Sequence, residues 1–383
     1  DGGNDNGHNS GSAHVFVRSG VEWTHQVKLL APDEAAYSFH WFGESVAIYE
    51  DKIAVCAKGN DDNGERRGSA YVFVRSGEEW TQRAKLLAPD GEAGYYFGIS
   101  IAIYENTIVV GAKYYDDNGY KIGSAHVFVR KGEEWKHQAK LLAPDAAINN
   151  WFGRSVAIYQ DTIVVSGYAS GSAHVFVRSG RSGEKWKHQA KLLAPVVGAA
   201  DDWFGVSAAI YENTIVVGAY NGYNNGSAHV FVRSGEKWTH QAKLLATDRA
   251  AGDRFGDSTA MYKNTIVVGA PLDDDNGGGA GSAHVFVRSG KEWKHEAKLL
   301  ALDGAALDMF GNSVAIYEDT IVVGAHRDDE NGELSGSAHV FVRSGREWSH
   351  QAKLLAPDGA VGDYFGSSTA IFGEVIVVGA YGD

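Results

Sequence analysis

Several things are scarce in this sequence of 383 residues, and each scarcity excludes a class of protein. The single cysteine, Cys56, excludes an intrachain disulfide. No apolar run approaches the roughly 18 residues that a membrane span needs. The formal charge of −13 disfavours a nucleic-acid partner, because phosphate binding needs a basic field. Proline numbers only 6 against 48 glycines, yet glycine does not occupy every third position, which excludes collagen.

Repetition is what the sequence has in abundance. Phe-Gly recurs seven times, each time accompanied by a Gly-Ser-Ala triplet and a later tryptophan. The phenylalanines, spaced 51 to 55 residues apart, are Phe42, Phe97, Phe152, Phe204, Phe255, Phe310 and Phe365. The tryptophans are Trp23, Trp80, Trp135, Trp186, Trp238, Trp293 and Trp348. A fixed period of this length indicates a repeat architecture, which replaces the two or three domains that length alone would suggest.

One unit, residues 310–358, shows what is repeated. It contains four short runs rich in Val, Ile, Phe and Trp, in the order FGNSVAIY, TIVVGA, SAHVFVR and WSHQAKLLA. Turn-forming residues bound each run, as they bound strands, and no run shows a helical period. The first two runs are almost wholly apolar, as in strands covered on both faces, whereas the fourth carries the charge that protects an exposed edge. The sequence therefore predicts an all-β, seven-bladed β-propeller with four antiparallel strands per blade; a linear β-solenoid is the alternative.

The two ends of the chain predict how the ring closes. The chain begins with a third and a fourth run and ends with a first and a second run. A closing blade shared between the N- and C-terminal ends would use both halves, whereas a linear array would leave half-repeats exposed. We therefore expect Val375–Ala380 to pair antiparallel with Ala13–Arg18. Residues 1–383 would then form a single propeller domain.

The repeated motifs resemble those of FG-GAP repeats, the blades of integrin α-chain propellers. The Phe-Gly pairs match, and so does the end of the second run, as at Val110-Gly111-Ala112; Gly269-Ala270-Pro271 gives the full Gly-Ala-Pro. The resemblance covers the whole chain and implies a seven-bladed propeller in an extracellular or cell-surface protein. The integrin calcium loop lies between the first two strands. Here that connection is only two residues, as at Glu105-Asn106, too short to give calcium six to eight oxygens.

Acidic residues gather instead between the second and third runs. Oxygen-rich loops of this kind suit calcium, although the distal glutamate of an EF-hand is missing. The alternative is a solvated turn, because Asp, Asn and Gly all favour tight conformations. The candidate calcium ligands are Asp61, Asp116, Asp273, Asp275, Asp328 and Glu330.

The position before each Phe-Gly is the most informative one, because it changes in identity among near-identical repeats while staying large. Its occupants are Trp41, Tyr96, Trp151, Trp203, Arg254, Met309 and Tyr364. Propeller connectivity would gather them around the central channel, on the face that also carries the acidic loops. Such a ring suits a sugar or a protein ligand. The alternative is that these side chains plug the channel or pack between blades.

Two further repeated residue types are interpreted as structural. The tryptophans would anchor packing, with a third-strand arginine stacked on each, as Arg130 on Trp135. Histidines such as His126 and His137 would lie on one face of a blade. They are expected to be packing positions rather than zinc ligands, because no carboxylate is expected beside them.

The sequence predicts a non-catalytic protein that binds a ligand or mediates adhesion outside the cell. It contains no Gly-x-Ser-x-Gly elbow and no phosphate-binding Gly-x-x-x-x-Gly-Lys-Ser/Thr loop. The expected partner is a protein or a glycan, with no nucleic acid and no transmembrane segment. A lectin and a structural assembly subunit are the alternatives, and a hydrolase is the least favoured.

Overall fold

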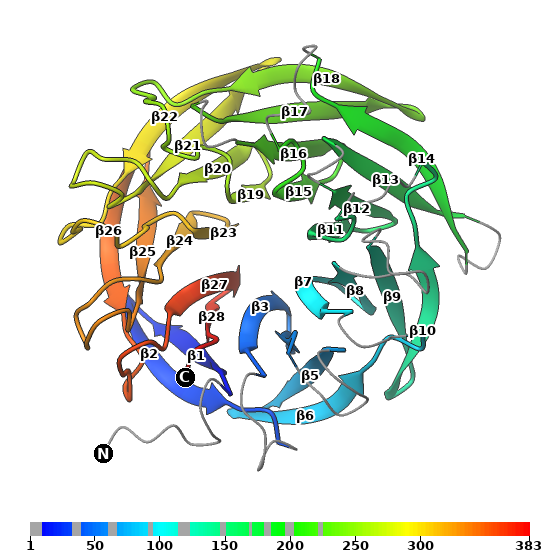
Figure 1. The fold of residues 1–383 in the computed structure, drawn as a ribbon, viewed down its shortest axis with the longest axis horizontal. Coiled ribbons are helices and arrows are strands. Elements are labelled where there is room, and N and C mark those ends of the chain that lie inside the picture. The colour runs from blue at the N-terminus through cyan, green and yellow to red at the C-terminus, as the bar shows by residue number, and fades with distance from the viewer. Residues whose placement is uncertain are drawn as a thin grey trace.

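A computed structural model shows the chain as seven four-stranded antiparallel sheets arranged around a central axis (Figure 1). The structure describes residues 10–32, 40–59, 67–90, 95–113, 123–145, 151–167, 171–179, 185–195, 203–220 and 225–383. The prediction of an all-β, seven-bladed propeller is confirmed.

The blades follow one another along the chain. Blade 1 contains β3 (Phe42–Tyr49), β4 (Lys52–Ala57), β5 (Ser69–Ser76) and β6 (Glu79–Leu86). Blade 2 contains β7 (Phe97–Tyr104), β8 (Thr107–Ala112), β9 (Ser124–Lys131) and β10 (Glu134–Leu141). Blade 3 contains β11 (Ser155–Tyr159), β12 (Thr162–Gly167), β13 (Ser172–Ser179) and β14 (Lys185–Leu193). Blade 4 contains β15 (Ala208–Tyr211), β16 (Thr214–Ala219), β17 (Ser227–Ser234) and β18 (Lys237–Leu244).

The remaining blades complete the circle. Blade 5 contains β19 (Thr259–Tyr262), β20 (Thr265–Ala270), β21 (Ser282–Ser289) and β22 (Glu292–Leu299). Blade 6 contains β23 (Ser313–Tyr317), β24 (Thr320–Ala325), β25 (Ser337–Ser344) and β26 (Glu347–Leu354). Blade 7 contains β27 (Phe365–Phe372), β28 (Val375–Ala380), β1 (Ser12–Ser19) and β2 (Glu22–Leu29).

Polarity orders the strands from the axis outward, as the sequence predicts. In every blade the first strand is innermost and the fourth is outermost (Figure 1). Second strands such as β20 are buried along their whole length, whereas fourth strands such as β22 have side chains open to solvent. One detail differs: in blades 3 to 6 the first strand begins after Phe-Gly, at Ser313 in blade 6.

Blade 7 joins the two ends of the chain. Its strand order is β2-β1-β28-β27, and β1 pairs antiparallel with β28 from Ser12 opposite Ala380 to Val17 opposite Val375. The backbone N–H of Arg18 adds a hydrogen bond of 2.9 Å to the carbonyl of Glu374. The predicted ring closure is therefore confirmed.

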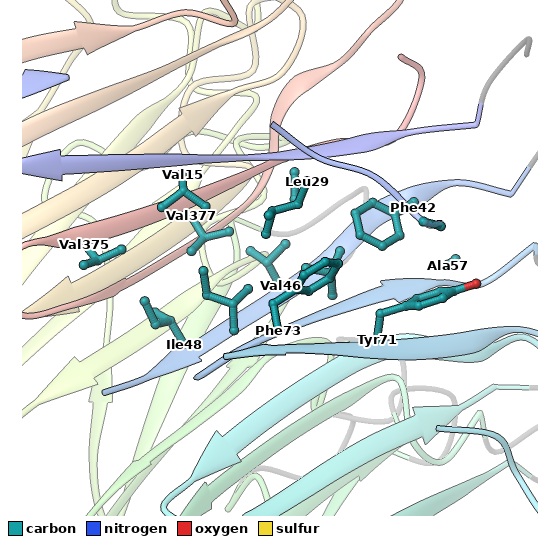
Figure 2. Close-up of a cluster of buried hydrophobic side chains, with 14 residues drawn as sticks. Val15, Leu29, Phe42, Val46, Ile48, Ala57, Tyr71, Phe73, Val375 and Val377 are labelled. Carbon is teal, nitrogen blue, oxygen red and sulfur yellow. The ribbon is translucent and has the colours of Figure 1, made fainter. Parts of the chain in front are cut away.

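The hydrophobic core lies between neighbouring blades. Figure 2 shows the cluster between blades 7 and 1, in which Val15 and Val377 of the closing blade face Val46, Ile48 and the rings beside them. Equivalent clusters fill the other interfaces. Because each blade buries its face only against the next, the stability of every blade depends on an unbroken ring.

The two repeated glycine motifs make the joint between blades. Gly281, just before β21, bridges to Phe310 of the next blade, and Phe310 N–H donates to the carbonyl of Ala280 at 2.9 Å. Gly281 has φ of +88°, and a Cβ there would lie 2.1 Å from the Phe310 carbonyl oxygen. Only glycine fits this approach, which explains why Gly-Ser-Ala and Phe-Gly recur together.

A closed ring of aromatic side chains surrounds the axis where the innermost strands end. Each ring centroid lies 4.7–5.2 Å from the next, all the way around the circle. The members are Tyr49, Tyr104, Tyr159, Tyr211, Tyr262, Tyr317 and Phe372. Burial among these neighbours raises the pKa of Tyr49 to about 12, so its phenol stays neutral. Through these contacts the seven blades pack against one another at the axis.

Among the described residues, no helix is long and apolar enough to cross a membrane.

Candidate functional site

The structure places all seven residues that precede Phe-Gly at equivalent points, at the start of the innermost strands. We call this set the mouth ring: Trp41, Tyr96, Trp151, Trp203, Arg254, Met309 and Tyr364. Every member has a left-handed backbone, with φ between 45° and 57°. This conformation costs about 1 kcal/mol for a residue with a side chain. Trp203 is 40% exposed, and the other six are half-buried.

The loops on this face meet as predicted. The loop after β20 contacts the loop that leads into blade 6: Leu307 N–H donates to the carbonyl of Gly278 at 3.0 Å, and Asn276 Nδ2 donates to that of Ala301 at 2.9 Å. The acidic loops therefore border the mouth ring.

A second ring, formed by the residue after each second strand, lies against the mouth ring. Two of its members are lysines. The Nζ of Lys58 lies 5.0 Å from the ring centroid of Trp41, and the Nζ of Lys113 lies 4.4 Å from that of Trp151. Both are cation–π distances. Sequence reasoning missed this ring, although its identity varies among repeats as that of the mouth ring does.

The aromatic members of the second ring continue the surface. Tyr220 meets Trp203 edge-to-face with centroids 5.3 Å apart. Tyr381 stacks on Tyr364 with centroids 5.0 Å apart and planes 8° apart. The aromatic side chains on this face are thus held in place by their neighbours, a rigid arrangement that suits ligand binding.

In five of the seven blades the residue that follows Phe-Gly is polar and adds to the same surface. Glu44 forms an ion pair with Lys58, and Asn312 Oδ1 accepts a hydrogen bond from the backbone of His326 at 3.3 Å. In blade 5 this position is Asp257, which Tyr220 hydrogen-bonds. Burial raises the pKa of Asp257, although nearby Arg154 and Arg254 oppose the shift.

The candidate calcium ligands lie elsewhere on this face, and those described are already paired with lysine. Asp61 and Asp116 lie outside the described residues. Lys298 Nζ lies 2.8 Å from Asp273 and 2.5 Å from Asp275. Burial opposes protonation of Lys298, yet these hydrogen bonds raise its pKa. Lys353 pairs in the same way with the other two predicted ligands, Asp328 and Glu330.

Hydrogen bonds within the acidic loops match the turn interpretation. Asp273 Oδ1 accepts from the backbone N–H of Asp275 at 3.0 Å, and Asp274 Oδ1 accepts from that of Gly279 at 2.7 Å. Two carboxylate–histidine clusters have a geometry that could hold a metal: Asp248, Asp273 and His284, and Asp303, Asp328 and His339. In both, a lysine ammonium already forms ion pairs with the carboxylates, so a divalent cation would have to displace it.

The histidines form pairs, and the expectation that no carboxylate lies beside them is wrong. His339 Nδ1 lies 3.1 Å from His350 Nε2. On its other side, His339 Nε2 lies 3.1 Å from Ser337 Oγ, which donates to Asp328 Oδ2 at 2.9 Å. The hydroxyl proton of Ser337 is used in the bond to Asp328, so the proton between His339 and Ser337 comes from His339 Nε2–H. His339 Nδ1 then carries no proton and accepts from His350 Nε2–H. Sequence spacing could not reveal this, because Asp328 approaches from a loop.

The repeated tryptophans are packing anchors, as interpreted from the sequence. Arg130 lies opposite Trp135 in the ladder, and Arg178 lies 4.9 Å from the ring centroid of Trp186. Trp186 Nε1 also donates to Gln138 of the preceding blade at 2.8 Å. Each such bond ties the outer strands of neighbouring blades together.

A hollow of about 880 Å³ lies on the opposite face, between blades 3 and 4. Its lining is polar and includes Gln160, Arg178, His188 and Glu212. Sequence reasoning did not predict this hollow. It is remote from the mouth ring, because its walls are the turns at the other end of the strands.

The fold and the mouth ring together define a propeller of seven repeated blades with a variable surface around its axis. A family model for the FG-GAP repeat matches residues 23–73, 80–128, 135–176, 186–231, 238–286, 293–341 and 348–383. The chain therefore belongs to the FG-GAP repeat family. No curated protein matches the sequence.

Solved structures share the fold at low identity. A protein of Bacteroides uniformis, described as a candidate 6-phosphogluconolactonase, is 9% identical, with a TM-score of 0.59 and coverage of 91% of this chain and 98% of that one. The periplasmic gluconolactonase PpgL of Pseudomonas aeruginosa is 10% identical, with a TM-score of 0.55 and coverage of 91% and 98%. At this identity the likeness shows the fold alone.

These neighbours correct the expectation of a non-catalytic protein. That expectation was drawn from missing motifs, and it is contradicted because the same fold occurs in proteins described as lactonases. A propeller can host a hydrolase without the motifs of other hydrolase folds.

Proposed function

We propose that residues 1–383 act as one ligand-binding propeller, outside the cell or on its surface, with the mouth ring as the binding surface. The observation that carries the proposal is the variety of the mouth ring within repeats that are otherwise nearly uniform. Packing alone favours the same side chain in each blade, as it does at the seven tryptophans. Large side chains in a left-handed backbone are costly features of the kind that gather at functional sites.

Membership of the FG-GAP family supports the location and the adhesion role, because integrin propellers are built from similar repeats. The Pseudomonas neighbour is described as periplasmic, which agrees with a protein that acts beyond the cytoplasm. A glycan and a protein are the two ligand classes that an aromatic ring flanked by charge serves best.

The test compares wild-type protein with Trp203→Ala on a glycan array and in a pull-down from the native cell surface. Because a central aromatic anchor carries much of a binding energy, we expect at least a tenfold loss of capture. Val21→Ala is the matched control, since Val21 is 72% exposed in a turn on the opposite face. Capture that survives in Trp203→Ala would contradict the proposal. A stable assembly unaffected by this change would favour the structural role instead.

A hydrolase is the second candidate, favoured by one specific observation. Asp257, whose pKa is raised by burial, lies near Arg154 and Arg254 in a fold shared with proteins described as lactonases. A carboxyl with a raised pKa suits general acid–base work, and arginine suits a developing negative charge. Hydrolysis of gluconolactone above its spontaneous rate, lost in Asp257→Asn, would support this candidate. A rate equal to the spontaneous one would exclude this substrate.

Calcium at the acidic loops is a separate prediction, which the lysine ion pairs disfavour. A chelator is expected to leave the melting temperature unchanged, because the ammonium groups of Lys298 and Lys353 already form ion pairs with the carboxylates of the described clusters. A fall of several degrees on chelation, reduced in Asp273→Asn, would instead support calcium.

A further inference from the structure

The side chains around Tyr220 differ from the rest of the mouth ring. Arg254 has its guanidinium carbon 5.4 Å from the ring centroid of Tyr220, and Trp203 meets the same ring edge-to-face at 5.3 Å. Asp257 is the hydrogen-bond partner of the Tyr220 hydroxyl. A cation, the most exposed ring of the set and a carboxyl group thus converge on one tyrosine.

Two arginines here have unused hydrogen-bonding capacity. Most arginines of the repeats donate Nε–H to a turn carbonyl, as Arg288 does to Gly290 at 3.1 Å. Across the described ranges, the guanidinium groups of Arg154 and Arg254 make no hydrogen bond and no ion pair within 4.0 Å. Both side chains are half-buried, and both interact electrostatically with Asp257. Arginine presents a planar fork of donors that matches a carboxylate.

Several cationic side chains lie around the axis on this face, although the protein as a whole is acidic. Four cationic side chains, Lys58, Lys113, Arg154 and Arg254, share the surface with the carboxylates of Glu44 and Asp257. The chain as a whole carries −13. In the described acidic loops nearby, Lys298 and Lys353 each form ion pairs with three carboxylates and offset part of their negative charge.

We propose that this cluster is a subsite for a sugar that carries a carboxylate, with Trp203 packing on the sugar ring and Arg154 and Arg254 binding the carboxylate. Trp203 and Arg254 both contact Tyr220, so one monosaccharide unit reaches both. The apolar face of a pyranose packs on an indole, whereas an acidic side chain of a peptide offers no such face. The inference deepens the proposed function and rests on it.

Asp257 sets the affinity of this subsite. Its carboxylate competes with that of the ligand for the same two arginines. An isosteric amide keeps an oxygen to accept the Tyr220 hydrogen bond and removes the negative charge. The Asp257→Asn variant should therefore bind an acidic sugar more tightly, a gain that a purely structural role for Asp257 would not produce.

Isothermal titration with trigalacturonate and with its methyl-esterified form tests the proposal, because the two ligands differ chiefly in charge. We expect the ester to bind at least tenfold more weakly to the wild type. Arg154→Gln and Arg254→Gln should each weaken trigalacturonate binding about tenfold, and Asp257→Asn should tighten it severalfold. Arg346→Gln, in an exposed turn on the opposite face, is the matched control and should bind as the wild type does.

Three outcomes would overturn the inference. Equal binding of acid and ester, or no effect of the arginine variants, would mean that the carboxylate is not recognised. Binding of a glutamate tripeptide with no binding of trigalacturonate would assign the arginines to an acidic peptide. Failure of all these ligands to bind would remove the subsite. The proposed function fails separately, only if capture on the array and in the pull-down does not depend on Trp203.

Discussion

The paired histidines show how single residues govern the response of this protein to acid. Burial, and to a lesser degree the neighbouring His350, lowers the pKa of His339 to about 4. An unfolded histidine titrates near 6.5. The folded state therefore binds fewer protons than the unfolded state between these values, so stability is full above pH 6.5 and falls as the pH drops toward 4. Asp308, whose pKa burial raises to about 6, opposes this trend but is outnumbered by the histidines.

Blade 1 provides a natural design for testing this effect, because Tyr71 and Gln82 occupy the positions of the histidine pair. The double variant His339→Tyr/His350→Gln copies that blade. The quantity compared is the free energy of unfolding of the variant minus that of the wild type. We expect this difference to shift in favour of the variant by on the order of 2 kcal/mol between pH 7.5 and pH 4.5. Urea unfolding at the two pH values measures this. An identical pH dependence in both proteins would show that the pair does not control acid stability.

Sequence reasoning at this scale succeeded where a pattern repeats and failed where residues meet across loops. The identity changes at Trp203 and its equivalents predict a binding surface, and the structure places these residues at equivalent points at the start of the innermost strands. The histidine pairing was also foreseen. The approach of Asp328 to His339 could not be, because it depends on how the loop before β25 folds back, and that of Arg254 to Tyr220 could not be, because the two residues belong to neighbouring blades.

At the scale of the element, the joint between blades depends on a close approach of two backbones. A Cβ at Gly281 would lie 2.1 Å from the Phe310 carbonyl oxygen, whereas nothing lies within 4 Å of a Cβ at Gly290. Both glycines have positive φ, +88° and +65°. Alanine substitutions at these two glycines therefore separate the cost of the steric contact from the cost of a left-handed backbone.

Gly290→Ala should lower the free energy of unfolding by about 1 kcal/mol, the cost of a left-handed alanine. Gly281→Ala should cost about 3 kcal/mol or more, because the added methyl group also forces the blades apart. Chemical denaturation of both variants compares them directly. Equal losses would mean that the Gly-Ser-Ala glycine serves backbone conformation only and not the joint.

The strands were predicted accurately from the sequence because the composition of each run matches the environment of the strand it forms. Runs such as TIVVGA are apolar throughout and are buried throughout, so composition and environment agree. The start of the first strand was the exception. In blade 6, Phe310 and Gly311 precede the ladder, which begins at Ser313.

At the scale of the whole molecule, the closure of blade 7 holds the ring together. Deleting residues 1–31 removes β1 and β2 and leaves β28 paired with β27 alone. Because the cluster in Figure 2 would lose Val15 and Leu29, we expect the melting temperature to fall by more than 10 °C, measured by circular dichroism. Deleting residues 1–9 retains every strand of the blade and is the control. A melt unchanged by the longer deletion would contradict the closed ring.

The two ends of the axis differ in kind, and this difference supports the proposed binding surface. One end is surrounded by a ring of six tyrosines and Phe372. The side chain there is the same in nearly every blade, as expected for a packing position. The other end carries the mouth ring, in which no single residue type dominates. A uniform ring stabilises the propeller, whereas a varied one suits recognition of an asymmetric ligand.

Hydroxyl-radical footprinting of the protein with and without its captured ligand tests the central claim most directly, because Trp, Met and Tyr side chains report their own exposure. The account predicts that ligand binding protects Trp203 and Met309 of the mouth ring. Protection confined to Tyr159 and His188, which line the hollow on the opposite face, with no change in the mouth ring, would contradict it.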